Sequence, residues 1–198
     1  MSIIVAVRKS NRIALAADSQ SNFGSHKFPP DNHKAEKIRE IGESLVAFSG
    51  WGLYENILDD YLGHAKTVRL ENQKEIFTFF RKLWKQLRDK YSFVNDQCKD
   101  ANDSPFGDLD SSFLIVNRNG IFDVSSNMTI SHFEKYNAIG SGAEFALGAL
   151  HALYDETGRD AASLARTGVE TGMAFSVYCG GEITVKEVRL TKSKQSKR

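Results

Sequence analysis

The chain has 198 residues, enough for a sizeable hydrophobic core, and its 26 basic and 25 acidic side chains nearly balance at a formal net charge of +1. This balance provides no overall field that would attract nucleic acid, a membrane surface or acidic ligands. The two cysteines are too few for a disulfide framework and indicate a reducing compartment.

The same inspection argues against metal sites, cofactors and membrane insertion. The five histidines are scattered, and no C-x-x-C or H-E-x-x-H spacing occurs. The opening apolar run Ile3–Val7 is far shorter than the roughly 20 residues that a membrane span needs. We therefore expect a cytoplasmic protein without a cofactor, a membrane anchor or a nucleic-acid partner.

Hydrophobic periodicity predicts strands and helix pairs along the chain. Continuous or alternating apolar runs indicate strands, and apolar residues three and four apart indicate helices with one buried face. In chain order we expect strands at Ile3–Val7, Ile13–Ala17, Lys34–Ile41 and Leu45–Phe48, helices at Tyr54–Ala65 and Ile76–Tyr91, a hairpin of Phe113–Val116 with Ile121–Val124, a strand pair within Met128–Ile139, helices after Gly142 and Asp160, and a last strand at Ile183–Val188.

The connecting segments carry expectations of their own. Ser19–Asp31 and Ser92–Asp110 are predicted to be polar loops, and the second is long enough to lie at an entrance. Asn119-Gly120 predicts a type I′ turn in the hairpin. The basic tail 191–198 lacks apolar residues and is expected to be disordered, outside a single domain of residues 1–190.

The order of these elements predicts the fold class. Strands, two helices, strands, two helices and a strand do not alternate as in a parallel sheet. The order favours an α+β protein in which two antiparallel sheets stack and carry a helix pair on each outer side, a four-layer αββα sandwich. The small residues of the helix after Gly142 (Ala143, Ala146, Ala149 and Ala152) allow the close packing that such layers need.

Ser2 stands directly before the first strand. If Met1 is removed, one residue carries both a hydroxyl and a free α-amine. Such an amine has a pKa of about 8, so near neutral pH a good fraction is neutral and can accept a proton. Ser2 would then supply both nucleophile and base. The alternative is an ordinary terminal serine, because many cytosolic chains begin this way.

An ordered set of short motifs, spanning nearly the whole chain, resembles the proteasome β-subunit family and in particular its bacterial ring-protease relatives. The motifs are the strand that starts at Ser2, Ala16-Ala17-Asp18-Ser19-Gln20, Gly24, Glu36-Lys37-Ile38-Arg39, Ala47-Phe48-Ser49-Gly50, Ile139-Gly140-Ser141-Gly142 and Tyr178-Cys179-Gly180-Gly181. The resemblance implies the N-terminal-nucleophile hydrolase fold and peptide-bond hydrolysis. It also implies stacked homo-oligomeric rings that act on peptides or unfolded proteins, with an ATP-dependent unfoldase as a further partner.

The resemblance also implies roles for five residues, each matched by its position in a motif. They are Ser2 as nucleophile, Asp18 and Lys37 as the acidic residue and lysine beside it, Gly50 as the oxyanion-hole glycine, and Ser141 as support for the N-terminal amine. Lys34 stays open as the lysine, because its spacing fits better although the following Ile38-Arg39 favours Lys37.

Three departures from the family pattern keep other functions open. Serine replaces the family's threonine, Ser176 and Cys179 replace an aspartate and a serine, and exposure of Ser2 is expected to depend on removal of Met1 alone. A catalytically inactive ring-forming subunit and a small-molecule amidase of the same fold are therefore the alternatives. A dinucleotide site at Gly140-Ser141-Gly142 is disfavoured, because Phe145 replaces the third small residue and no βαβ unit surrounds it.

Overall fold

The computed structural model describes residues 2–29, 31–65, 67–91, 109 and 111–190. The expectations for Met1, for most of the 92–110 loop and for the tail 191–198 lie outside these residues.

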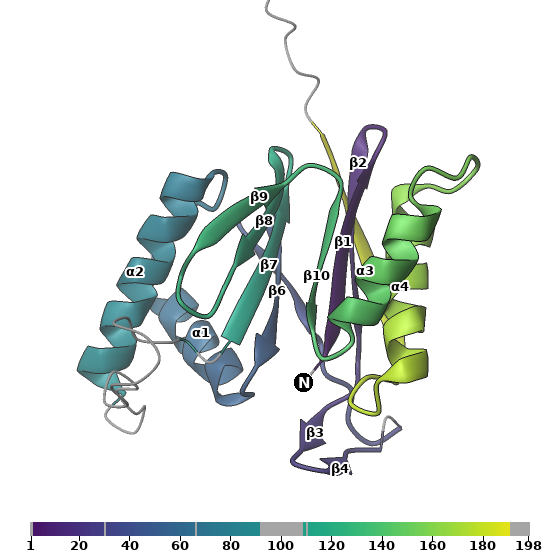
Figure 1. Cartoon of the computed structure of the whole chain (residues 1–198). Helices are drawn as coiled ribbons and strands as arrows, with labels where there is room; N and C mark the ends of the chain where they lie inside the picture. Colours follow the sequence, from purple (N-terminus) through teal and green to yellow (C-terminus); the bar gives the residue numbers. More distant parts are fainter. Residues whose placement is uncertain (1, 30, 66, 92–108, 110, 191–198) are drawn as a thin grey trace, which may run out of the picture.

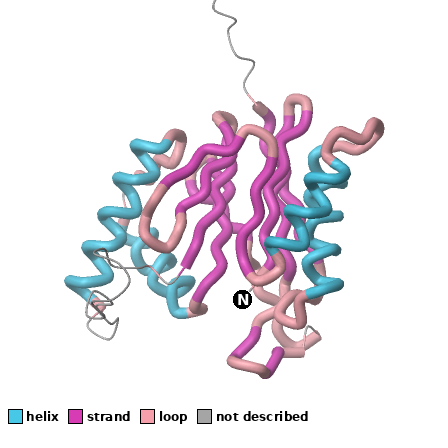
Figure 2. The backbone as a smooth tube through the Cα atoms, viewed as in Figure 1, coloured by secondary structure: helices cyan, strands magenta, loops and turns pink. Residues whose placement is uncertain are grey.

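Two antiparallel sheets lie face to face, and a pair of helices covers the outer side of each (Figures 1 and 2). The first sheet has the order β10-β1-β2-β11, and the second has the order β5-β6-β7-β8-β9. Helices α1 and α2 cover the second sheet, while α3 and α4 cover the first. The predicted α+β, four-layer αββα sandwich is therefore confirmed.

The centre of the first sheet is the hairpin that opens the chain. Strands β1 (Ile3–Lys9) and β2 (Arg12–Asp18) pair with each other, β10 (Tyr136–Gly140) pairs with β1, and β11 (Ile183–Arg189) pairs with β2. Residues on both faces of the two central strands are buried, because one face meets α3 and α4 and the other meets the second sheet. This double burial explains why their sequences are apolar at nearly every position.

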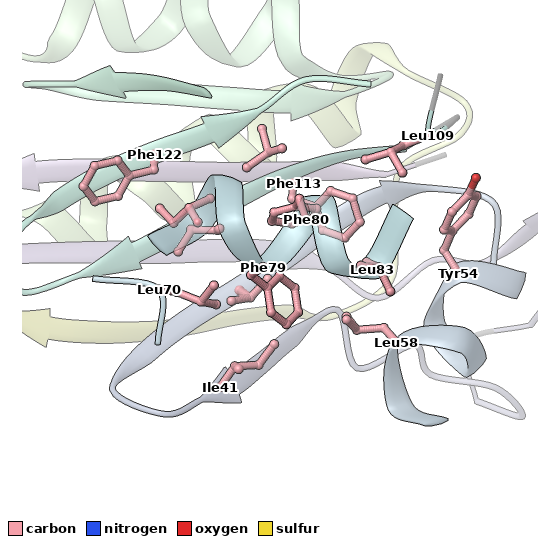
Figure 3. Close-up of a cluster of buried hydrophobic side chains, with 14 of the residues drawn as sticks. Ile41, Tyr54, Leu58, Leu70, Phe79, Phe80, Leu83, Leu109, Phe113 and Phe122 are labelled. Carbon is pink, nitrogen blue, oxygen red and sulfur yellow. The ribbon is translucent and has the colours of Figure 1, made fainter. Parts of the chain in front are cut away.

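The second sheet contains β5 (Ile38–Ile41), β6 (Ser44–Gly50), β7 (Ser111–Asn117), β8 (Gly120–Val124) and β9 (Ile130–Phe133). Its outer face packs on aromatic side chains of the helix layer (Figure 3). There the rings of Phe80 and Phe113 meet edge to face, with centroids 4.7 Å apart.

The helices are α1 (Leu53–His64), α2 (Gln73–Lys90), α3 (Ala143–Leu153) and α4 (Ala161–Phe175). Side chains cap the starts of α2, at Asn72, and of α4, at Asp160, whereas α1 and α3 begin without a side-chain cap. The side chain of Asp160 accepts the Ser163 N–H at 2.7 Å, and the Ser163 hydroxyl accepts the Asp160 N–H in return. This capping box confirms Asp160 as the start of the last helix.

Three local predictions are wrong. The strand expected at Lys34–Ile41 begins only at Ile38, because the preceding residues lead the chain toward Asp18. The loop expected at Ser19–Asp31 contains a short hairpin, β3 (Asn22–Phe23) with β4 (His26–Lys27).

The third error concerns the β7–β8 turn, where Asn117 pairs with Gly120. Its central residues are therefore Arg118 and Asn119, and the only non-glycine residues with positive φ in the described chain are Ser10 and Met128, which excludes type I′. A hydrogen bond from the Asn119 N–H to Asn117 Oδ1, at 2.8 Å, stabilises the turn instead.

The strand pair expected within Met128–Ile139 consists of two strands that do not pair with each other. β9 pairs with β8 in the second sheet, whereas β10 pairs with β1 in the first. The chain crosses between the sheets at Glu134 and Lys135, so the loop joins the two layers at one edge of the sandwich (Figure 1).

Candidate active site

A buried ion pair lies at the end of β2. The Nζ of Lys37 donates to Oδ1 of Asp18 at 2.6 Å, and the two side chains are only 9% and 0% exposed. Burial lowers the pKa of Lys37 below its ordinary value, while the charge and hydrogen bond of Asp18 oppose this shift and Cys179 and Glu55 oppose it more weakly. Lys37 therefore releases its proton more readily than an exposed lysine, yet it keeps a carboxylate partner.

The Asp18 carboxylate also binds the backbone of two other segments. Oδ1 accepts the N–H of Ile3 at 3.0 Å, and Oδ2 accepts the N–H of Gly180 at 3.0 Å. One buried side chain thus connects Lys37, the start of β1 and the turn before β11. Because Ile3 follows Ser2 directly, this carboxylate fixes the backbone at the proposed nucleophile.

Ser2 is itself buried, at 5% exposure. Gly140 and Ser141, at the end of the neighbouring strand β10, contact its backbone. Its carbonyl accepts a hydrogen bond from the Ser141 hydroxyl at 3.3 Å. A Cβ at Gly140, where φ is +96°, would lie 2.2 Å from the same carbonyl oxygen. Only glycine therefore permits this close approach.

Gly50 is the last residue of β6 and pairs with Ser111 of β7, and β6 ends at the end of the sandwich where β1 begins (Figure 1). The neighbouring Ser49 reaches the Ser2 region, since its Oγ lies 3.0 Å from the position of a Cβ at Gly140. From Gly50 the chain passes through Trp51 into α1. Ser49 thus places the end of β6 beside the contact between Gly140 and Ser2.

The structure distinguishes the two lysines that the sequence left open. The Nζ of Lys34 pairs with Glu182 at 2.6 Å on the surface, where the side chains are 54% and 71% exposed. Lys37, not Lys34, contacts Asp18. The Ile38-Arg39 motif therefore indicated the lysine that contacts Asp18 correctly, whereas the spacing that favoured Lys34 did not.

Two features of the site were missed from the sequence. The Gly180 N–H contacts Asp18 through its backbone, which no side-chain pattern can indicate. The contact of Cys179 was also missed: this residue closes the turn that begins at Ser176, and its Sγ is 3.5 Å from the Ser141 hydroxyl. Its place in the Tyr178-Cys179-Gly180-Gly181 motif was the available signal.

Arg39 closes the Glu36-Lys37-Ile38-Arg39 motif and links two elements next to the site. Its guanidinium binds Glu55 at 2.5 Å and Asp59 at 2.9 Å, both on α1. Arg39 thus joins the strand that follows Lys37 to the helix that follows Gly50.

The described residues hold neither a cluster of metal-ligating side chains nor a helix that could cross a membrane. No group of three or more His, Cys, Asp and Glu side chains lies close enough there to hold a metal ion. No helix in the same part of the chain is long and apolar enough to cross a membrane.

The stacked sheets, with a buried lysine–aspartate pair beside the first residue of the first strand, define the class of N-terminal-nucleophile hydrolases. Solved structures agree. The Thiobacillus denitrificans protein BPH shares 32% sequence identity, with a TM-score of 0.86 over 96% of this chain and 98% of its own. The same protein in complex with epoxomicin shares 31% identity, with a TM-score of 0.85 over 96% of this chain and 100% of its own. HslV of Trypanosoma brucei, at 20% identity and a TM-score of 0.65 over 94% of this chain and 99% of its own, shares the fold.

Sequence comparison identifies bacterial relatives. The ATP-dependent protease subunit HslV of Caldicellulosiruptor saccharolyticus is 27% identical over 196 residues, which cover 93% of this chain and 97% of that protein. HslV of Desulfovibrio desulfuricans is 28% identical over 194 residues, covering 92% and 95% respectively. No family model matches the sequence. The chain belongs to the proteasome β-subunit-like family of N-terminal-nucleophile peptidases.

Proposed function

We propose that the hydroxyl of Ser2, freed by removal of Met1, is the nucleophile of this peptidase and that its α-amine is the base. The observation that carries this proposal is the shared carboxylate oxygen of Asp18, which accepts from Lys37 at 2.6 Å and from the N–H that follows Ser2 at 3.0 Å. A cation and the start of β1 are thereby held together in a buried site.

The proposed reaction has two steps. The α-amine takes the Ser2 proton as the oxygen attacks the peptide carbonyl, and the Lys37 ammonium lowers the cost of the negative charge on the attacking oxygen. The Gly50 N–H stabilises the oxyanion, an effect typically worth about 3 kcal/mol. The tetrahedral intermediate expels the amine product, which takes the proton from the α-ammonium. Water, activated by the same amine, then hydrolyses the ester.

We further infer that copies of this chain form closed, stacked rings that restrict the site to peptides and unfolded proteins. The relatives named HslV are subunits of ATP-dependent proteases, which supports an ATPase as partner. The sequence contains no G-x-x-x-x-G-K-[ST] motif, so ATP hydrolysis would come from that partner.

A comparison of three proteins tests the proposal. We expect Ser2→Ala to lose cleavage of fluorogenic peptides and Ser2→Thr to retain it, because threonine keeps the hydroxyl. Intact mass should show loss of Met1 in the wild type and an adduct after treatment with epoxomicin, the compound found with the Thiobacillus relative. Full activity of Ser2→Ala would refute the assignment, and retained Met1 without an adduct would support the inactive-subunit alternative.

A further inference from the structure

Cys179 contacts Ser141, the residue whose hydroxyl binds the Ser2 carbonyl. Cys179 is buried, at 6% exposure, and its Sγ lies 3.5 Å from the Ser141 Oγ. The Ser141 hydroxyl donates in turn to the Ser2 carbonyl at 3.3 Å. The Cys179 thiol, the Ser141 hydroxyl and the Ser2 carbonyl therefore form a continuous chain from the turn before β11 to the start of β1.

The proton count of the middle residue sets the direction of this chain. A serine hydroxyl has one proton and two lone pairs, and a thiol has one weak donor. Because the Ser141 proton is used on the Ser2 carbonyl, its oxygen can only accept from the Cys179 thiol. The donors therefore run from Cys179 through Ser141 to Ser2.

The surroundings keep the thiol in this position. The N–H of Cys179 donates to the Ser176 carbonyl at 3.1 Å, which fixes the turn. A Cβ at Gly142 would lie only 3.2 Å from Sγ, so the missing side chain leaves room for the sulfur. Ser141, by contrast, is exposed, and water can compete for its hydroxyl. A hydrogen bond from the buried Cys179 thiol to the Ser141 oxygen would keep the Ser141 hydroxyl pointing at the Ser2 carbonyl.

We propose that Cys179 is a positioning residue that acts through Ser141 to fix the carbonyl of Ser2. This inference rests on the proposed role of Ser2 as nucleophile. A carbonyl held on one side by Ser141, next to an N–H held by Asp18, leaves the Ser2 residue little freedom to rotate. Loss of the thiol would free the Ser141 hydroxyl and reduce turnover more than substrate binding.

Single and double variants test this route. We expect Cys179→Ala to lower kcat by about three- to tenfold, as for loss of one hydrogen bond, with KM nearly unchanged. Cys179→Ser keeps a donor and should retain activity. Cys179→Ala should have no further effect in the Ser141→Ala background, because its effect passes through Ser141. Val169→Ala, in the same buried cluster on α4, is the control for lost packing and should keep wild-type kcat.

Two outcomes would overturn the inference: wild-type kcat in Cys179→Ala, or multiplicative losses in the double variant. Ser2→Ala in the same assay separates this from the proposed function, since its full activity would refute the nucleophile instead. Crystal structures of the wild type and Cys179→Ala give a readout independent of turnover. We expect the Ser141 Oγ to turn away from the Ser2 carbonyl in the variant, and an unchanged position would also overturn the proposal.

Discussion

Lys37 and Ile3 donate to the same oxygen of Asp18, one from an ammonium at 2.6 Å and the other from a backbone N–H at 3.0 Å. The two donors come from segments that are far apart along the chain, and the carboxylate between them has no exposed surface. The charge state of the site and the position of β1 therefore depend on one side chain.

We expect Asp18→Asn to abolish peptidase activity and to lower the free energy of unfolding by about 3 kcal/mol, because it leaves a buried lysine without a counter-ion. Adding Lys37→Met should restore most of the stability and none of the activity. Lys34→Met is the control, since its surface pair is worth less than about 1 kcal/mol. Denaturant unfolding and peptide cleavage measure both effects. An active Asp18→Asn variant would contradict the proposed role of the pair.

The lowered pKa of Lys37 predicts a dependence of stability on pH. Between this lowered pKa and the ordinary lysine value of 10.5, the unfolded chain binds more protons than the folded one, so stability contributed by this group rises with pH. We expect the difference in unfolding free energy between wild type and Lys37→Met to shift in favour of the wild type as pH rises through this window. Urea unfolding at several alkaline pH values tests this, and a difference that is constant with pH would contradict it.

Gly140→Ala should displace Ser2. The new methyl group would lie 2.2 Å from the Ser2 carbonyl oxygen, and the φ of +96° adds strain, so we expect a loss of several kcal/mol in stability together with activity. Gly148→Ala is the matched control, because its Cβ would meet nothing within 4 Å in an exposed part of α3. It should raise stability by about 0.5–1 kcal/mol. Thermal unfolding of both variants tests the pair, and equal effects would contradict the argument.

Asp123 makes a separate prediction. Burial raises its pKa from 3.8 to about 6. It lies on β8, opposite Leu114 and Ser131. The folded chain holds the proton more tightly, so stability from this group is present below pH 3.8 and is lost as pH rises through about 6. We expect Asp123→Asn to stabilise the protein at pH 7 by about 1 kcal/mol, a value reduced because the group is partly exposed, and to have less effect near pH 4. Asp155→Asn, on the surface, should show no such difference.

Arg39→Lys should reduce turnover with little loss of stability. A lysine cannot bind Glu55 and Asp59 together as the guanidinium does, so α1 and the adjoining Gly50 would be held less firmly. We expect kcat to fall about tenfold or less and the unfolding free energy to fall by about 1 kcal/mol. Arg12→Lys, whose partner Glu187 lies on the surface, is the control. Unchanged kcat in Arg39→Lys would show that this connection does not position the site.

The layers of the fold could be predicted from the sequence alone, because burial of one or both faces of a strand or helix requires apolar residues at regular positions. The apolar run Ala14–Ala17 indicated a strand covered on both sides, and Asp160 marked the start of α4 through local hydrogen bonds. Ser2, Asp18 and Ser141 were predicted to be site residues because their motifs occur in the family's order. Such signals depend on neighbours in the chain, which a sequence displays directly.

Only the tertiary structure decided which lysine meets Asp18, which sheets receive β9 and β10, and what Cys179 contacts. Each of these contacts depends on segments that are brought together across the sandwich. Lys34 and Lys37 are close together in the sequence, so sequence position alone does not distinguish them. Burial distinguishes the two lysines: the Lys37 ammonium contacts the buried Asp18 carboxylate, whereas the Lys34 ammonium remains at the surface. Long-range packing, not local preference, determines the chemistry of this site.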